Sequence, residues 1–168
     1  AGTDVTSSTS DITITDNSMS LATGNGLQVN TAGKLTIQPY GNNFTSLTYP
    51  ITNFAVSSDV TGLTIGKDLG STAHTDTVTI GGITSISGPI NVYAGTINVN
   101  ANLSSSLAGA QILLKASGDI SFASGVDITT QGGKQVFWSD SDVSGAGGIT
   151  SVNTTTNYGL FTTNGGDI

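Results

Sequence analysis

The sequence contains no cysteine, no glutamate and no arginine, and it has only four lysines. Without cysteine the chain forms no disulfide, so packing and hydrogen bonds must stabilise it. Because Glu, Arg and Lys are good helix formers, their scarcity predicts almost no helix. Apolar runs are short, as at Ile112-Leu113-Leu114, and none approaches the ~20 residues that cross a bilayer. We therefore expect an all-β chain that is not inserted in a membrane.

The charged residues are few and mostly negative. All eleven acidic residues are Asp, and the formal net charge is −7. Nucleic acids and anionic membrane surfaces attract basic patches, so this balance argues against both as partners.

Half of the chain consists of four residue types: 27 Thr, 21 Ser, 13 Asn and 23 Gly. Thr favours strands, whereas Gly, Asn and Ser favour turns. Disorder is not expected, because only 9% of residues are charged and the 36% that are apolar are spread through the whole chain.

A short repeat runs through residues 111–142, which divide into the units QILLKASG, DISFASGV, DITTQGGK and QVFWSDSD. Each unit places a β-branched residue second and another inward residue two positions later, followed by a small or polar corner. This is the pattern of a short strand with one buried face. The predicted core ladder is Ile112, Leu114, Ile120, Phe122, Ile128, Val136 and Trp138.

Shared units and few hairpin turns favour a solenoid over an antiparallel sandwich. We predict a right-handed parallel β-helix with about three short strands and roughly 24 residues per coil, hence roughly seven turns. Leu35/Ile37 are then expected above Ile12/Ile14, and Val136/Trp138 above Ile112/Leu114. The rod would be about 30–35 Å long.

Residues 1–168 are interpreted as one solenoid segment with an irregular excursion around 38–60. That stretch contains two of the three prolines and the aromatic residues Tyr40, Phe44, Tyr49 and Phe54. These rings are candidates for stacking on sugar rings or docking a partner, and the alternative is that they pack against a solenoid face.

The run GPINVYAGTINVNANL, followed by ILLKASGDISFASGVDITTQGG and VFWSDSD, resembles the repeats of filamentous-haemagglutinin-like bacterial exoproteins. The resemblance is clearest over residues 60–168. It implies a parallel β-helix in a large secreted surface protein with a role in adhesion, aggregation or matrix building. It brings no catalytic motif.

Catalytic or metal sites find little support, and we expect neither an enzyme nor a bound cofactor. Asp140 and Asp142 are the one close carboxylate pair, and with Gly145 they are a weak calcium candidate, although a solvated turn explains them as well. His74 is the only histidine and is expected on the surface.

Two other patterns leave alternatives open. Thr13 and Thr15, like Thr77 and Thr79, would present outward threonines as ice-binding solenoids do, but outward Asp, Asn and Gln interrupt the pattern. Sequons at Asn43, Asn102 and Asn153 allow surface glycans.

The chain ends predict how the unit is used. Asp167-Ile168 repeats the strand opening of Asp119-Ile120 and Asp127-Ile128, and no helix, proline or charge cluster follows it as a cap. Uncapped solenoid ends template further pairing. We expect stacking end to end, with neighbouring repeats or with copies of the chain, into an extracellular fibre at the cell surface.

Overall fold

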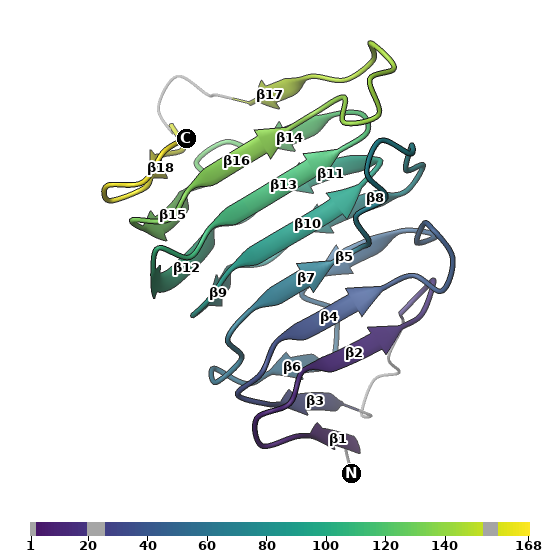
Figure 1. Cartoon of the computed structure of the whole chain (residues 1–168), viewed down its shortest axis with the longest axis vertical. Helices are drawn as coiled ribbons and strands as arrows, with labels where there is room; N and C mark the ends of the chain where they lie inside the picture. Colours follow the sequence, from purple (N-terminus) through teal and green to yellow (C-terminus); the bar gives the residue numbers. More distant parts are fainter. Residues whose placement is uncertain (1–2, 20–25, 153–157) are drawn as a thin grey trace.

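The computed structural model describes residues 3–19, 26–152 and 158–168. These residues form a solenoid of about six turns in which every strand pair is parallel, which confirms the predicted fold class (Figure 1). They contain no helix, and therefore none long and apolar enough to cross a membrane.

Among the described residues, the first wall of the solenoid is a single sheet of six strands. Its strands follow one another at one per coil: β2 (Ile12–Thr15), β4 (Leu35–Gln38), β7 (Leu63–Ile65), β10 (Ile90–Ala94), β13 (Ile112–Ala116) and β16 (Gln135–Trp138).

The second wall has five strands: β5 (Leu47–Tyr49), β8 (Thr77–Ile80), β11 (Thr96–Val99), β14 (Ile120–Phe122) and β17 (Ile149–Ser151). The third wall is split into two sheets. One contains β1 (Thr3–Thr6), β3 (Leu27–Asn30) and β6 (Phe54–Val56), and the other contains β9 (Thr84–Ile86), β12 (Leu103–Ala108), β15 (Ile128–Gln131) and β18 (Phe161–Thr162).

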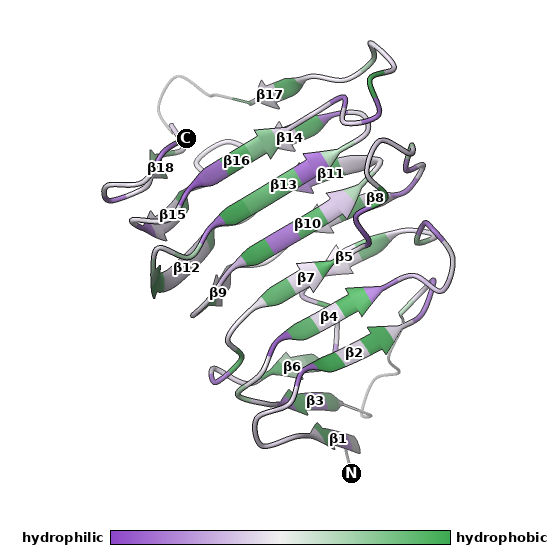
Figure 2. Ribbon diagram, viewed as in Figure 1, coloured by the Kyte–Doolittle hydropathy of each residue, from purple (hydrophilic) through white to green (hydrophobic). Residues whose placement is uncertain are grey.

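The core lies between the walls and consists of stacked Ile, Leu and Val side chains. The predicted ladder of Ile12 with Leu35 and of Ile14 with Ile37 is confirmed by the pairing of β2 and β4. Hydrophobic and more hydrophilic positions alternate along β2, β4, β7 and β10 of the first wall (Figure 2). Each fully buried Ile or Leu stabilises the fold by about 1.5–3 kcal/mol relative to an exposed one.

The predicted inward residues Ile112, Leu114, Ile120, Phe122 and Ile128 are buried. The prediction is wrong for Val136 and Trp138. In β16, Gln135 pairs with Ile112 and Phe137 with Leu114, so Val136 and Trp138 face outward, and Trp138 is 49% exposed.

The cause of this shift is a corner that is one residue shorter than the eight-residue spacing requires. Gly133 lies so close to Ala110 that a Cβ would collide with the Ala110 carbonyl group. The Lys134 carbonyl then accepts the hydrogen bond from the Ile112 N–H, which makes Gln135 the first inward residue.

Gln135 and Phe137 fit the inward positions for different reasons. The Gln135 amide group donates hydrogen bonds to the carbonyl oxygens of Ile128 and Thr162, at 3.1 and 2.8 Å. Phe137 contacts Phe122 and Phe161, with ring centroids 5.2 and 5.1 Å apart. One ring from each wall thus takes part in a three-ring cluster near this end of the core.

Short acidic and amide side chains join successive coils at the corners. Asp11, Asp119 and Asp127, each one residue before an inward Ile, accept hydrogen bonds from the main-chain N–H groups of Lys34, Gly148 and Leu160, at 2.8, 2.8 and 2.9 Å. Asn17, Asn43 and Asn102 accept likewise from Tyr40, Thr75 and Asp127, at 2.7, 2.9 and 2.9 Å. We call these side chains coil-to-coil acceptors.

Segment 38–60 lies largely within the coil. It supplies β5 to the second wall and β6 to the third, each paired in parallel with a neighbouring coil. What departs from the strand pattern is the corner at 39–46 and the turn that follows Pro50.

Candidate functional site

The predicted aromatic cluster is dispersed by the fold. Phe44, Tyr49 and Phe54 are 3–7% exposed and belong to the core, whereas Tyr40 is 83% exposed on the outside. The four rings therefore do not share one exposed surface, because β5 and β6 turn Tyr49 and Phe54 inward. Burial raises the pKa of Tyr49 to about 12.

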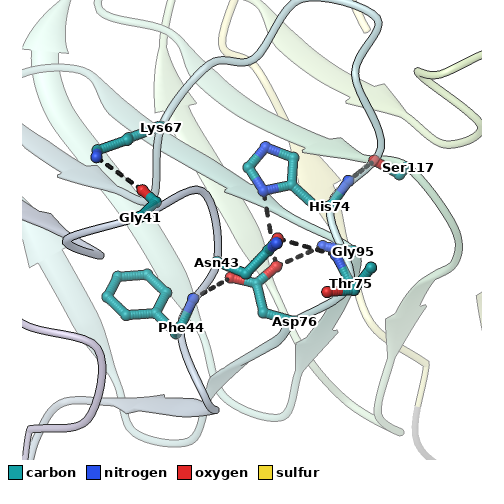
Figure 3. Close-up of polar contacts among 9 residues, drawn as sticks. All are labelled: Gly41, Asn43, Phe44, Lys67, His74, Thr75, Asp76, Gly95 and Ser117. Atoms are coloured by element: carbon teal, nitrogen blue, oxygen red, sulfur yellow. Dashed lines mark hydrogen bonds and ion pairs between the residues drawn. The ribbon is translucent and has the colours of Figure 1, made fainter.

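A long loop, residues 66–76 between β7 and β8, runs along the corner between the first and second walls. We call it the corner brace (Figure 3). Lys67 Nζ donates to the carbonyl oxygens of Tyr40 and Gly41 in the preceding coil, at 3.1 and 2.7 Å. The Thr75 N–H donates to Asn43 Oδ1 of the same coil, at 2.9 Å.

Asp76 is the centre of the brace. Its side chain is 1% exposed, and its two carboxylate oxygens accept hydrogen bonds from the main-chain N–H groups of Phe44, at 3.0 Å, and Gly95, at 2.9 Å. Phe44 belongs to the preceding coil and Gly95 to the following one. One buried carboxylate thus connects three successive coils.

His74 is buried, so the expectation of a surface histidine is wrong. The main-chain N–H of His74 donates to Ser117 Oγ at 2.7 Å. The imidazole ring lies inside the brace, with Nδ1 3.7 Å from Asp76 Oδ1. Nδ1 is buried without a hydrogen-bond partner. Ser117 contacts the main chain of His74 and the ring extends away from it (Figure 3), so these three residues do not form a nucleophile–base–acid relay.

The brace also reaches the coils beyond. Asp68 Oδ1 lies 2.7 Å from Lys115 Nζ on β13, and this hydrogen bond is the main cause that lowers the pKa of Asp68. Lys115 Nζ lies 4.8 Å from the ring centroid of Trp138 on β16, a cation–π contact. Burial and the Asp68 charge raise the pKa of Tyr93, which pairs with Lys115 on the neighbouring strand.

Asp140 and Asp142 lie in a turn in which their carboxylate oxygens accept hydrogen bonds from residues of the same turn. Asp140 has a φ of 52°, and its carboxylate accepts hydrogen bonds from Ser144 Oγ and from the Gly145 N–H, both at 3.0 Å. Asp142 Oδ1 accepts from the Ser144 N–H at 3.4 Å. Among the described residues, no three His, Asp or Glu side chains gather in a way that could hold a metal ion.

Outward threonines form only a partial row. Thr13, Thr36 and Thr64 are in register on three successive strands of the first wall. The same row continues with Asn91, Leu113 and Val136, so the repeat that a flat threonine lattice requires is interrupted.

The third wall contains a recess where its two sheets meet. The edge strands β6 and β9 are not paired with each other. Between them lies a cavity of about 310 Å³, near the lower end of the range for ligand pockets. It is lined by Tyr49, Pro50, Phe54, Val56, Ser57, Ser58, Ile83, Thr84, Ser85 and Ile86. Two of the four predicted ligand-binding rings, Tyr49 and Phe54, therefore border the same recess.

Sequence reasoning missed the residues that build the brace, chiefly Asp68, Asn43 and Asp76. A local signal existed, because Asp and Asn occur where one wall turns into the next. The sequence does not reveal which donor group in another coil each side chain reaches, since these partners lie 19 to 47 residues away.

Comparison of the chain with protein-family models, with curated proteins and with solved structures finds no match.

Proposed function

We propose that the chain is a non-catalytic structural and adhesive segment of a large secreted bacterial surface protein, in which coils continue end to end into an extracellular fibre. The next coil belongs either to the same polypeptide or to another copy of the chain.

The observation that supports stacking is the position of Asp167. The Gln135 N–H donates to the Asp167 carbonyl oxygen at 2.9 Å, as the Ile112 N–H does to Lys134 and the Ile90 N–H does to Gln111. Asp167 thus occupies the position that precedes an inward strand residue. Its carboxylate is 83% exposed and lies 3.9 Å from Lys134 Nζ. By analogy with Asp11, Asp119 and Asp127, we propose that it accepts the main-chain N–H of a further coil.

The open end of the core supports the same proposal. A cavity of about 460 Å³ lies at this end, lined by Lys134, Gln135, Val136, Phe137, Ile149, Asp167 and Ile168. A further coil would cover these apolar side chains, and each 100 Å² of apolar area removed from water stabilises the stack by roughly 2.5 kcal/mol.

Amide hydrogen exchange tests the proposal at a single residue. Alternation along β16 turns the Phe137 N–H away from β13, toward the position of a further coil, whereas the Val136 N–H faces β13. We expect the Phe137 amide to exchange rapidly in the isolated chain and to be protected in the native material, with Val136 protected in both. Rapid exchange of Phe137 in the native material would contradict stacking.

The absence of catalysis is part of the proposal and has its own test. Ser117 Oγ accepts the main-chain N–H of His74, and the Asp140 carboxylate accepts hydrogen bonds from the main-chain N–H of Gly145 and from Ser144 Oγ. A glycan-degradation screen of the purified chain is expected to show no turnover. Reproducible turnover that Asp140→Ala or Asp142→Ala abolishes would overturn this part.

A further inference from the structure

The recess between β6 and β9 is closed at both of its corners. A Cβ on Gly82 would lie 2.9 Å from Pro50 Cδ, so the two coils touch on that side. At the other side, Ser87 Oγ donates a hydrogen bond to the Val60 carbonyl oxygen at 3.0 Å. The two coils are therefore separated only between β6 and the four residues 83–86. Four residues of a strand span about 13 Å.

The two walls of the recess carry main-chain groups that face each other. On β6, the Asn53 carbonyl and the Ser57 N–H are bonded to β3. Because successive residues of a strand point to opposite sides, the Val56 N–H and the carbonyl groups of Phe54 and Val56 face β9. On β9, the Thr84 N–H is bonded to Asn102, which turns the N–H and carbonyl group of Ser85 toward β6.

These facing edges are not joined in the structure. No hydrogen bond links Phe54–Val56 to residues 83–86 in this described part of the chain. Unpaired strand edges are templates for another extended chain. The recess thus offers main-chain donors and acceptors on two sides.

Side chains complete the surface of the recess. Tyr49, Phe54, Val56 and Ile86 form its inner side, Ser57, Ser58 and Ser85 lie at its rim, and Ile83 is 78% exposed beside it. None of the lining residues is charged, and none carries a carboxylate or amide side chain. Sugar hydroxyl groups would find serine, threonine and tyrosine hydroxyls, but no carboxylate or amide side chain to fix a ring.

We propose that the recess binds a short extended peptide of a partner protein, which adds as a strand between β6 and β9. The bound stretch is three or four residues long and uncharged, with one apolar side chain pointing inward onto Tyr49 and Phe54. Because both corners are closed, the peptide turns outward at each end, as the tip of a protruding loop does. A stacked fibre does not require this site, so the inference goes beyond the proposed function.

The test uses a fluorescent hexapeptide, Gly-Leu-Gln-Val-Asn-Thr, blocked at both ends. It copies residues 26–31, whose strand β3 pairs with the other edge of β6. Fluorescence polarisation measures its binding to the full chain. A peptide of the same sequence, N-methylated at alternate amides, can pair along only one of its edges, so it cannot add as a strand between β6 and β9. This control requires no change in the protein.

Ser85→Pro is the decisive variant. It removes the N–H that faces the recess but leaves the Thr84 N–H that binds β12, and proline is tolerated at such an edge. Ser85→Ala is the matched control, since it keeps the N–H group. Loss of one hydrogen bond is expected to weaken binding about tenfold.

The proposal expects binding by the wild-type chain and Ser85→Ala, about tenfold weaker binding by Ser85→Pro, and loss of binding for the N-methylated peptide. Circular dichroism first establishes that Ser85→Pro is folded; if it is not, the N-methylated peptide decides. Three results would overturn the proposal: no binding of the hexapeptide, equal binding of the methylated peptide, or a glycan on an array that binds and displaces the hexapeptide.

Discussion

Replacement of Asp76 by alanine tests the corner brace most severely. The carboxylate is buried and accepts hydrogen bonds from the N–H groups of Phe44 and Gly95, in two different coils. A hydrogen bond to a charged group contributes about 1.5–3 kcal/mol, and alanine leaves both donors buried and unpaired. We therefore expect the free energy of unfolding to fall by about 3–6 kcal/mol, a large part of the 5–15 kcal/mol typical of a domain.

Urea denaturation, followed by the fluorescence of Trp138 and by far-ultraviolet circular dichroism, measures this loss. Asp59→Ala is the matched control, because Asp59 is an exposed corner residue and its removal is expected to change stability by less than about 0.5 kcal/mol. Asp76→Asn keeps one acceptor oxygen and is expected to lie between the two. If Asp76→Ala costs less than about 1 kcal/mol, the brace does not hold the coils together and the reasoning is refuted.

Three further predictions concern the register, the core and the outer ion pair. Phe137→Ala is expected to lower the free energy of unfolding by about 2–4 kcal/mol because it removes an inward ring, and Val136→Ala by less than about 1 kcal/mol; equal losses in urea denaturation would contradict the observed register. Tyr49 has a pKa of about 12 in the folded chain, whereas its ordinary value is 10.0. Its contribution to the free energy of unfolding is therefore complete below pH 10 and is lost as the pH rises toward 12. Tyr49→Phe should remove that alkaline loss, which denaturation at several pH values measures; an unchanged alkaline profile would refute it. The pKa of Asp68 is lowered from 3.8 chiefly by the hydrogen bond from Lys115. The ion pair therefore contributes to the free energy of unfolding above pH 3.8, and this contribution is lost as the pH falls through the lower pKa that Asp68 has in the folded chain. An acid titration of Trp138 fluorescence should show this loss in the wild type and not in Asp68→Asn; identical titrations would show that the pair does not reach Trp138.

The fold class was predictable because two signals agree. The β-branched residues at i and i+2 define one buried face, and the small residues between them define the corners. Ile112, Leu114 and Ile120 were therefore placed correctly from spacing alone. A parallel solenoid repeats one coil, so each correct strand predicts its neighbours.

The register of β16 was not predictable from spacing. Gln135 is polar and Trp138 is large and apolar, so the pattern favours Trp138 inside. The structure reverses this because Gly133 must fit against Ala110, and because Gln135 finds two main-chain carbonyl acceptors inside the coil. Tertiary contacts of this kind override a local pattern.

The candidate sites were harder to predict than the core. Tyr49 and Phe54 were predicted either to bind a ligand or to pack against a solenoid face; they are buried, and they border the recess between the two sheets of the third wall. The brace was missed because Asp76 and His74 lie in a polar stretch without periodicity. Only the three-dimensional path of residues 66–76 brings them against the neighbouring coils.

Cryo-electron microscopy of the native material tests the proposed end-to-end stacking. Stacked coils form rods much longer than the roughly 25–30 Å of six coils, with a spacing of about 4.8 Å along the rod axis from the parallel strands. Density should continue past β16, β17 and β18 into a further coil, with the Asp167 carboxylate accepting its main-chain N–H. A compact particle whose end strands are covered by residues of the same molecule would contradict the account.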